Sequence, residues 1–272
     1  MELAGKVFVV TGGGGGIGRQ LVLRLLQRGA IVAAVDINPD ALRVTQEMVA
    51  PNADKLSVHQ VDISDRSAVA QLVQNVIQQH SQVDAIINNA GVIHPFKPVN
   101  ELQYAAIDKV FNVNLHGVIN LTKEFLPLLL NRPAAHITNI SSMGGLFAFP
   151  KQTFYGASKA AVKLISEGLY AELKGTNVGV TVVFPGAINT DITRNSDSHD
   201  EKLDRFNRER LSTSPETAAL KIVEAIEQNR FSLHIGLDAK LLGFLYRMLP
   251  KTTVRLLSRI MKIAIPDCEQ NR

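Results

Sequence analysis

The strongest constraint on the fold is a regular alternation of short apolar runs with longer stretches of helical periodicity. Several apolar runs are near-continuous in valine, isoleucine and alanine, which is typical of strands buried on both faces of a parallel sheet. Strand and helix alternating in this way predict right-handed βαβ units and a doubly wound α/β sheet with helices on both faces. The predicted strands are 7–10, 31–35, 56–61, 85–87, 136–140, 178–184 and 231–235, and the predicted helices are 19–28, 39–49, 66–80, 102–129, 155–174 and 215–228.

The chain is expected to form one domain, residues 1–236, followed by a helical appendage, residues 237–272. Hydrophobic residues make up 46% of the 272 residues and no linker-like stretch divides them, which is typical of a single packed domain. The only cysteine is Cys268, so a disulfide within the chain and a cysteine-cluster metal site are both excluded. No metal is expected. Without a signal sequence or a run long enough to span a membrane, we expect a cytoplasmic protein.

The positive charge is concentrated in the appendage. From Lys240 onward there are seven lysines and arginines and two acidic residues, a net charge of +5. The whole chain carries +4, so residues 1–239 carry −1. A nearly neutral body argues against nucleic acid as its partner.

A glycine-rich turn follows the first predicted strand and leads directly into a helix. It reads Thr11-Gly12-Gly13-Gly14-Gly15-Gly16-Ile17-Gly18. In doubly wound sheets ligands bind at the carboxyl ends of the strands, and glycines there let the backbone approach a pyrophosphate at a helix N-terminus. Gly12, Gly16, Ile17 and Gly18 are therefore candidate dinucleotide-binding residues. Taken alone, the turn could also be a tight turn without a ligand.

Two acidic residues end the next predicted strands. Asp36 lies 18 residues after Gly18, where a carboxylate can bind the adenosine ribose hydroxyls and repel a 2′-phosphate. No arginine or lysine stands at positions 15 or 37, so the expected cofactor is NAD rather than NADP. Asp62 is placed to meet the adenine, or alternatively to cap the helix that follows it.

Tyr155 and Lys159 stand at positions i and i+4 of a predicted helix and share one face of it. Interconversion of an alcohol and a carbonyl needs a group that takes or gives the hydroxyl proton. A free tyrosine has a pKa near ~10, and a neighbouring ammonium is expected to lower it. The pair is therefore a candidate acid/base unit, with an amphipathic surface pair as the alternative.

Together with Asn88-Asn89-Ala90-Gly91, Asn114, Ser141-Ser142 and Pro185-Gly186, these motifs resemble the short-chain dehydrogenase/reductase family over nearly the whole chain. The resemblance implies a Rossmann-like fold and a catalytic set of Asn114, Ser142, Tyr155 and Lys159. Ser142 precedes Tyr155 by 13 residues, the usual interval in the family, which favours it over Ser141.

The resemblance also implies roles for other residues. Ser142 would bind the reacting oxygen, Lys159 the nicotinamide ribose, and Asn114 would kink its helix and hold a water of a proton relay. Asn89 lies in a loop that packs against the cofactor. Ile188, through its backbone, and Thr190, through its hydroxyl, would meet the carboxamide.

The substrate region carries a weaker signal. Between Ser142 and Tyr155 the sequence is apolar, which suits an apolar alcohol or ketone but is also explained by core packing; the residues are Met143, Leu146, Phe147, Phe149 and Phe154. His94 could contact substrate, although a solvated loop histidine is the simpler interpretation. Residues 194–210 are strongly polar and match the lid region of the family.

Two apolar helical stretches, 241–249 and 254–263, are interrupted by Pro250 in the appendage. The second has a basic face and could touch an anionic membrane surface, cover the substrate cleft or pack against another subunit. A homodimer or homotetramer is expected. The resulting prediction is an NAD-dependent oxidoreductase acting on a small-molecule alcohol or ketone. A non-catalytic dinucleotide-binding scaffold or sensor, and an isomerase or dehydratase of the same family, are the alternatives.

Overall fold

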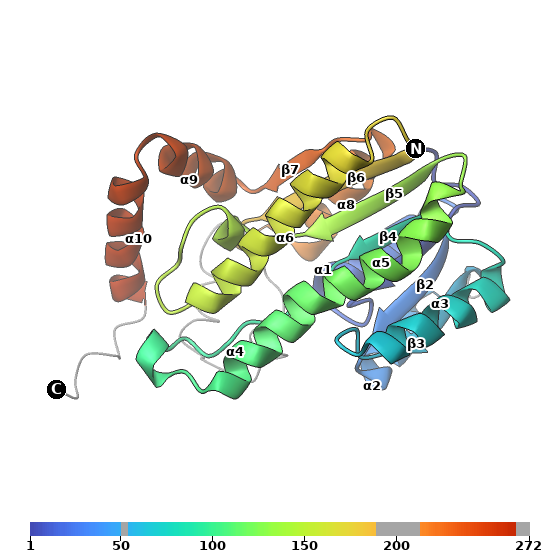
Figure 1. The fold of residues 1–272 in the computed structure, drawn as a ribbon, viewed down its shortest axis with the longest axis horizontal. Helices are drawn as coiled ribbons and strands as arrows, with labels where there is room; N and C mark the ends of the chain where they lie inside the picture. Colours follow the sequence, from blue (N-terminus) through green and yellow to red (C-terminus); the bar gives the residue numbers. More distant parts are fainter. Residues whose placement is uncertain (50–53, 189–212, 265–272) are drawn as a thin grey trace.

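The computed structural model describes residues 1–49, 54–188 and 213–264. Its centre is a seven-stranded parallel sheet in the order β3-β2-β1-β4-β5-β6-β7, which confirms the predicted α/β Rossmann-like fold (Figure 1). All seven predicted strands are present, with ends that differ from the prediction by one residue at most. They are β1 (Val7–Thr11), β2 (Ile31–Asp36), β3 (Leu56–Gln60), β4 (Ala85–Asn88), β5 (Ala135–Ile140), β6 (Val178–Pro185) and β7 (Ser232–Ile235).

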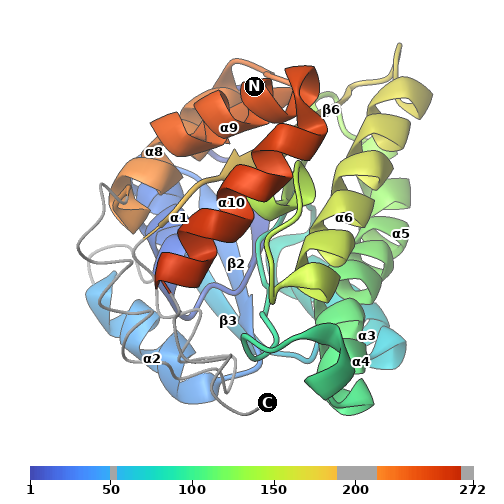
Figure 2. The same cartoon turned by 90° about the vertical axis from the view of Figure 1, so that its left-hand side faces the viewer.

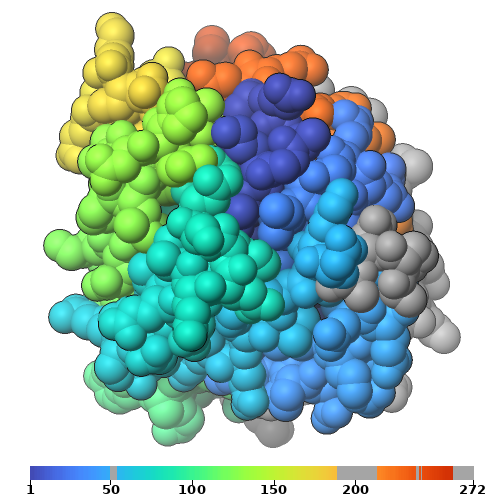
Figure 3. Space-filling model, turned by 90° about the vertical axis from the view of Figure 1, so that its right-hand side faces the viewer, coloured from blue at the N-terminus to red at the C-terminus, as the bar shows by residue number. Residues whose placement is uncertain are grey.

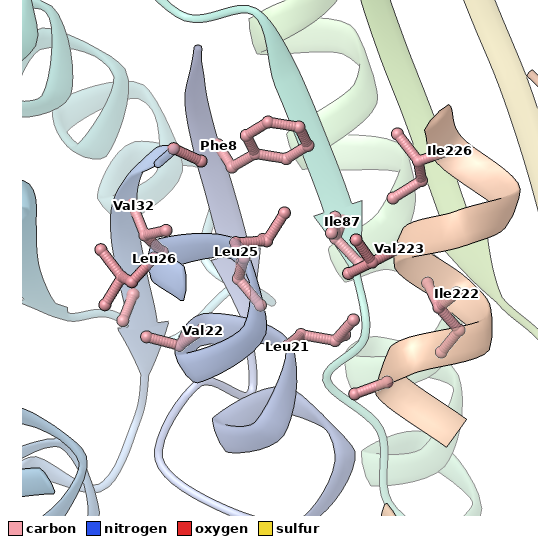
Figure 4. Close-up of a cluster of buried hydrophobic side chains, with 14 of the residues drawn as sticks. Phe8, Leu21, Val22, Leu25, Leu26, Val32, Ile87, Ile222, Val223 and Ile226 are labelled. Atoms are coloured by element: carbon pink, nitrogen blue, oxygen red, sulfur yellow. The ribbon is translucent and has the colours of Figure 1, made fainter. Parts of the chain in front are cut away.

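Helices cover both faces of the sheet and bury a core on each. The first core lies under α1 (Gly16–Gln27), α2 (Pro39–Met48) and α8 (Pro215–Glu227). In Figure 4, Phe8 of β1 packs among leucines of α1 while Ile222 and Ile226 of α8 close the other side. The second core lies under α3 (Arg66–His80), α5 (Gly117–Leu130) and α6 (Thr153–Glu172).

Polar caps fix where several of these helices begin. The Asn38 side chain accepts a hydrogen bond from the Ala41 amide, and Asp65 accepts from the Ser67 and Ala68 amides. Ser214 caps α8 in the same way, immediately before Pro215. At the far end of α8 the amino group of Met1 donates to the Glu227 carbonyl, so the N-terminus lies beside the C-terminal end of this helix (Figure 3).

The predicted single helix over 102–129 is wrong in its middle. The chain forms α4 (Tyr104–Phe111), then one π-helical turn, Asn112–His116, and then α5. A π turn inserts one extra residue into the helical spacing and is common at functional sites. Asn114 lies within it, in agreement with the bend that the family resemblance implies.

The C-terminal residues form two helices beyond β7, namely α9 (Leu237–Met248) and α10 (Pro250–Ala264) (Figure 2). Pro250 does not interrupt a helix but begins one, because proline lacks only an amide that the first turn leaves unbonded anyway. For this reason α10 starts four residues earlier than predicted. Among the described residues there is no helix with the length and hydropathy needed to cross a membrane.

Candidate active site

The glycine-rich turn lies at the carboxyl edge of the sheet, where β1 has β2 on one side and β4 on the other. Gly12 has a φ of 68°, a conformation that favours glycine, and a Cβ there would lie 2.8 Å from Asn89 Nδ2. Gly15 precedes α1 without any side-chain cap, so the amides of the first turn remain available to an anion. The geometry fits a dinucleotide pyrophosphate.

Asp36 meets this turn from the end of β2. Its Oδ2 atom accepts a hydrogen bond from the Gly14 amide at 2.9 Å, and its Oδ1 atom accepts one from the Asn38 amide at 3.1 Å. The neighbouring Ile37 is 63% exposed and brings no charge. The carboxylate thus stands beside the glycine turn, where an adenosine ribose would bind.

Arg19 is a neighbour of the turn that the sequence analysis missed. Its guanidinium donates to Thr45 Oγ1 at 3.0 Å and also to the Gly14 carbonyl, so it ties α1, α2 and the turn together. Through these bonds the Arg19 guanidinium holds the turn in place. In the sequence, the only indication of this role was the position of Arg19 directly after Gly18.

The loop after β4 is bonded to the end of β1. Asn89 Nδ2 donates to the Thr11 carbonyl at 2.9 Å, and Thr11 Oγ1 accepts from the Asn89 and Ala90 amides. Asn88 instead donates to Asn139 Oδ1, inside the sheet. The loop is therefore fixed beside the glycine turn, as expected for residues that pack against a dinucleotide.

Asp62 does not cap α3, which is capped by Asp65. Its Oδ1 atom accepts from the amide and hydroxyl of Ser64, and the side chain is exposed. The alternative role as a helix cap is therefore wrong. An exposed carboxylate at the end of β3 stays compatible with an adenine contact.

Asn114 and Lys159 converge on the backbone of Gly91. The fully buried Asn114 accepts from the Val92 amide at 2.8 Å and donates to the Val92 carbonyl at 2.9 Å and to Ser158 Oγ at 3.1 Å. A Cβ on Gly91 would lie 3.1 Å from Lys159 Nζ and 3.2 Å from Asn114 Oδ1. The π turn therefore brings the two predicted residues to one point.

Ser142 and Tyr155 meet just beyond the end of β5. Ser142 lies extended directly after the strand, and its hydroxyl accepts from the Gly144 amide at 3.0 Å. Burial raises the pKa of Tyr155 above its ordinary value, and the hydrogen bond with Ser142 works in the opposite direction. At neutral pH the phenol is therefore protonated and can serve as an acid.

The pKa of Tyr155 is raised and not lowered, contrary to the effect expected of Lys159. Its ammonium donates to the Ile140 carbonyl at 2.9 Å, and Lys159 is not among the causes of the Tyr155 shift. Burial lowers the pKa of Lys159 itself to about 8. The helical spacing correctly predicted a shared face, but it could not show which acceptor the ammonium would choose.

Aromatic side chains line the wall between Ser142 and Tyr155. The rings of Phe147 and Phe149 lie 5.3 Å apart, and Tyr246 of α9 packs against Phe147 at 6.1 Å. A Cβ on Gly144 would touch both Tyr155 and Phe149, which places this aromatic wall beside the phenol. The contribution of Tyr246 could not be inferred from the sequence, because it depends on where α9 packs.

His94 is buried and not a solvated loop residue. Its Nδ1 atom lies 2.8 Å from the Pro95 carbonyl, and Gln152 Nε2 donates to the His94 carbonyl at 2.7 Å. His94 Nε2 and Gln152 Oε1 are buried and find no hydrogen-bond partner among the described residues. Burial lowers the pKa of His94, so the ring is neutral at pH 7.

Two predicted cofactor residues follow β6. Ile188 pairs with Thr213 in a short parallel bridge, which directs its backbone along the sheet edge. Thr190 lies outside the described residues, as does the whole 194–210 stretch. Within the described part of the chain, no three histidine, cysteine or acidic residues are grouped to hold a metal ion.

Replacing Gly91 with alanine is expected to lower kcat about tenfold. The added Cβ would push Asn114 and Lys159 apart by a few tenths of an ångström, and small misplacements of catalytic groups are costly. The matched control is Gly168→Ala in α6, where a Cβ meets nothing within 4 Å. Equal activity of the two variants would show that the spacing of Asn114 and Lys159 around Gly91 has no role in turnover.

Comparison with known proteins gives a consistent family. Residues 6–201 match the family described as short chain dehydrogenase. SadH of Mycobacterium tuberculosis is 34% identical, over 93% of this chain and 94% of that protein.

Two solved structures share the fold over nearly their full length. A short chain dehydrogenase/reductase from Burkholderia phymatum in complex with NAD superposes with a TM-score of 0.82 at 26% identity, covering 100% of this chain and 99% of that one. A short chain dehydrogenase from Burkholderia cenocepacia in complex with NADP gives 0.79 at 25% identity, covering 94% and 99%. The chain therefore belongs to the short-chain dehydrogenase/reductase family of oxidoreductases.

Proposed function

We propose that the protein is an NAD-preferring oxidoreductase that interconverts a secondary alcohol and a ketone. The observation that carries this proposal is the meeting of Asn114, Ser142, Tyr155 and Lys159 beside the glycine turn. A protein that only binds a dinucleotide has no need of a tyrosine, a serine and a buried lysine at one point. This argues against the scaffold or sensor alternative.

The chemical roles follow from the geometry. A bound nicotinamide would supply hydride chemistry at the substrate carbon. In reduction, the Tyr155 phenol donates its proton to the carbonyl oxygen, while the Ser142 hydroxyl holds that oxygen in place. Lys159, with its pKa near 8, can return a proton to the site. Asn114 holds the neighbouring backbone at Val92 in place. In oxidation the same protons move in the opposite direction.

The cofactor contacts are assigned by the same reasoning. Amides of the turn, at Gly12, Gly16, Ile17 and Gly18, would bind the pyrophosphate, and Asp36 the adenosine ribose. Asp62 would meet the adenine and Asn89 the edge of the nicotinamide half. The backbone of Ile188 and the hydroxyl of Thr190 would bind the carboxamide.

The aromatic wall supports an apolar substrate. The half-buried rings of Phe149 and Tyr246, backed by the buried Phe147, form an aromatic cluster near Tyr155, and Leu146 packs against α9. Removing an apolar substrate from water against these rings lowers the free energy of binding. The rings also offer a carbonyl few competing polar partners. A lipid-like, steroid-like or aryl ketone fits this description better than a sugar.

The test is a screen of apolar secondary alcohols and ketones that follows NADH absorbance, with Tyr155→Phe assayed in parallel. Turnover in the parent and its loss in the variant would support the proposal. Cofactor binding by calorimetry without turnover of any compound would favour the scaffold. Conversion of a substrate with no net change in NADH would favour the isomerase or dehydratase.

Asp36 is expected to make the protein bind NADH more tightly than NADPH. Its carboxylate would hydrogen-bond the ribose hydroxyls and repel a 2′-phosphate. Asp36→Ala combined with Ile37→Arg removes the repulsion and adds a cation, and we expect the preference to shift by at least about tenfold toward NADPH. Calorimetry with both cofactors measures it. Equal or tighter binding of NADPH by the unmodified protein would contradict the assignment.

For the assembly we propose a dimer built on α5 and α6. Leu164 and Tyr170 are exposed apolar residues on the outside of α6, and Leu130 ends α5 with another. Exposed apolar residues on both helices are typical of subunit contacts. The molar mass in solution, measured by light scattering on the parent and on Leu164→Glu, tests this.

A further inference from the structure

The two C-terminal helices carry an outer surface that the described residues of the chain leave uncovered. On α9, Leu241, Phe244 and Met248 follow one another at i, i+3 and i+7 and are 68%, 67% and 65% exposed. The other side of α9 packs inward, with Ala239 fully buried and Tyr246 against Phe147. The apolar stripe is thus not needed to hold α9 in place.

α10 adds a row of basic side chains to the same protruding unit. Lys251, Arg255 and Arg259 are spaced four residues apart and all are exposed, whereas Thr253 and Leu257 on the inner side are buried. In the part of the chain that the structure describes, these three residues form no ion pair. The sequence between positions 239 and 264 contains six lysines and arginines and no acidic residue.

The two helices pack against each other at the outer edge of the molecule, beyond β7 (Figures 1 and 2). Met248 ends the apolar stripe and Lys251 begins the basic row three residues later, so the two features meet where α9 joins α10. This combination suits one partner best. A second copy of this surface would bring two strongly positive units together, which is electrostatically unfavourable. An anionic bilayer takes up exposed apolar side chains at the boundary between headgroups and acyl chains, and it attracts the basic row.

We infer that α9 and α10 form a peripheral docking surface for membranes that contain anionic lipids. Leu241, Phe244 and Met248 enter the interfacial region, while Lys251, Arg255 and Arg259 bind lipid phosphates. The surface lies outside the catalytic residues, and the inference does not depend on which reaction the protein catalyses.

The experiment is vesicle flotation of the full-length protein. One set of vesicles contains phosphatidylcholine alone and the other contains phosphatidylcholine mixed with phosphatidylserine. We expect binding to the second set only, and weaker binding in high salt because the Debye length shrinks. Lys251→Glu/Arg255→Glu/Arg259→Glu and Phe244→Ser/Met248→Ser should each lower the partition coefficient by at least about tenfold.

A matched control separates local from overall charge. Arg66→Glu/Lys174→Glu/Lys221→Glu changes three exposed basic residues on other surfaces and alters the net charge by the same amount. It should bind phosphatidylserine vesicles like the parent. The inference is overturned if the parent does not float with these vesicles, or if control and α10 variants lose binding equally. A fall in oligomer mass in Phe244→Ser/Met248→Ser, with no vesicle binding by the parent, would identify a subunit interface instead.

Discussion

Tyr155→Phe is expected to lose about 10²–10⁴-fold in kcat while it still binds cofactor. The change removes only the phenolic oxygen, which meets the Ser142 hydroxyl, and keeps the ring against the aromatic wall. Without that oxygen neither proton donation to a ketone nor proton removal from an alcohol has a group to perform it. Steady-state rates in both directions measure the loss, and calorimetry with NADH measures the binding that should remain.

Ser142→Ala provides the comparison that identifies the role of Tyr155. Ser142 positions the reacting oxygen but transfers no proton in the proposed scheme. The fall in kcat of Ser142→Ala should therefore be smaller than that of Tyr155→Phe. A Tyr155→Phe enzyme that turns over within a few-fold of the parent would remove the tyrosine from the acid/base role. So would a Ser142→Ala enzyme that is the more severely impaired of the two.

Most of the fold could be predicted from the sequence because its signals are local and redundant. Buried parallel strands are runs of apolar residues bounded by turns, and all seven were visible as such. Helix starts are marked by residues such as Asn38 and Ser214, each followed by proline. Agreement among these independent signals is what makes a sequence specify one fold.

The errors fall where long-range packing decides the local geometry. The π turn around Asn114 is stabilised by bonds to Val92 and Ser158, which come from other parts of the chain. The periodicity within 102–129 contains no sign of these bonds. The prediction that His94 is solvated was wrong for a related reason, since Phe154 and Gln152 at the start of α6 enclose it.

In the active site, too, local spacing could be predicted and long-range packing could not. Spacing predicted that Tyr155 and Lys159 share a helix face, because four residues make about one turn. The acceptor of the Lys159 ammonium is the Ile140 carbonyl, at the end of β5, and only the packing of α6 on that strand places it there. The electrostatic role of the lysine therefore had to be revised from the structure.

That revision predicts where the pH dependence of the reaction originates. The pKa of Tyr155 is raised by burial, so the phenol stays protonated across the neutral range, whereas the pKa of Lys159 is lowered to about 8. Oxidation sends a proton out of the site, and a neutral Lys159 can accept it. Oxidation should therefore rise with pH through an apparent pKa near 8, and reduction, which draws a proton in, should fall over the same range.

Lys159→Met should lower kcat by at least about 100-fold and abolish this transition, leaving oxidation to rise only at higher pH, where Tyr155 ionises. The measurement is kcat/KM against pH in both directions, with an isotope effect to show that hydride transfer is rate-limiting. A parent profile without a transition between pH 6 and 10, or a Lys159→Met profile that keeps one near 8, would contradict the assignment.

Thermal unfolding of Lys159→Met separates loss of chemistry from loss of fold. The pKa of Lys159 falls from its ordinary 10.5 to about 8 on folding, so between these values the unfolded chain holds more protons and the stability of the parent rises with pH. Below about pH 8 both states are protonated and the full cost of burying the ammonium remains, roughly 3 kcal/mol by the linkage relation. Methionine removes that cost but leaves the Ile140 carbonyl without the lysine donor, which lowers the free energy of unfolding by about 1 kcal/mol. At pH 7 the variant should therefore have a Tm equal to or a few degrees above that of the parent, measured without cofactor, and a much lower Tm would assign the lysine a mainly structural role.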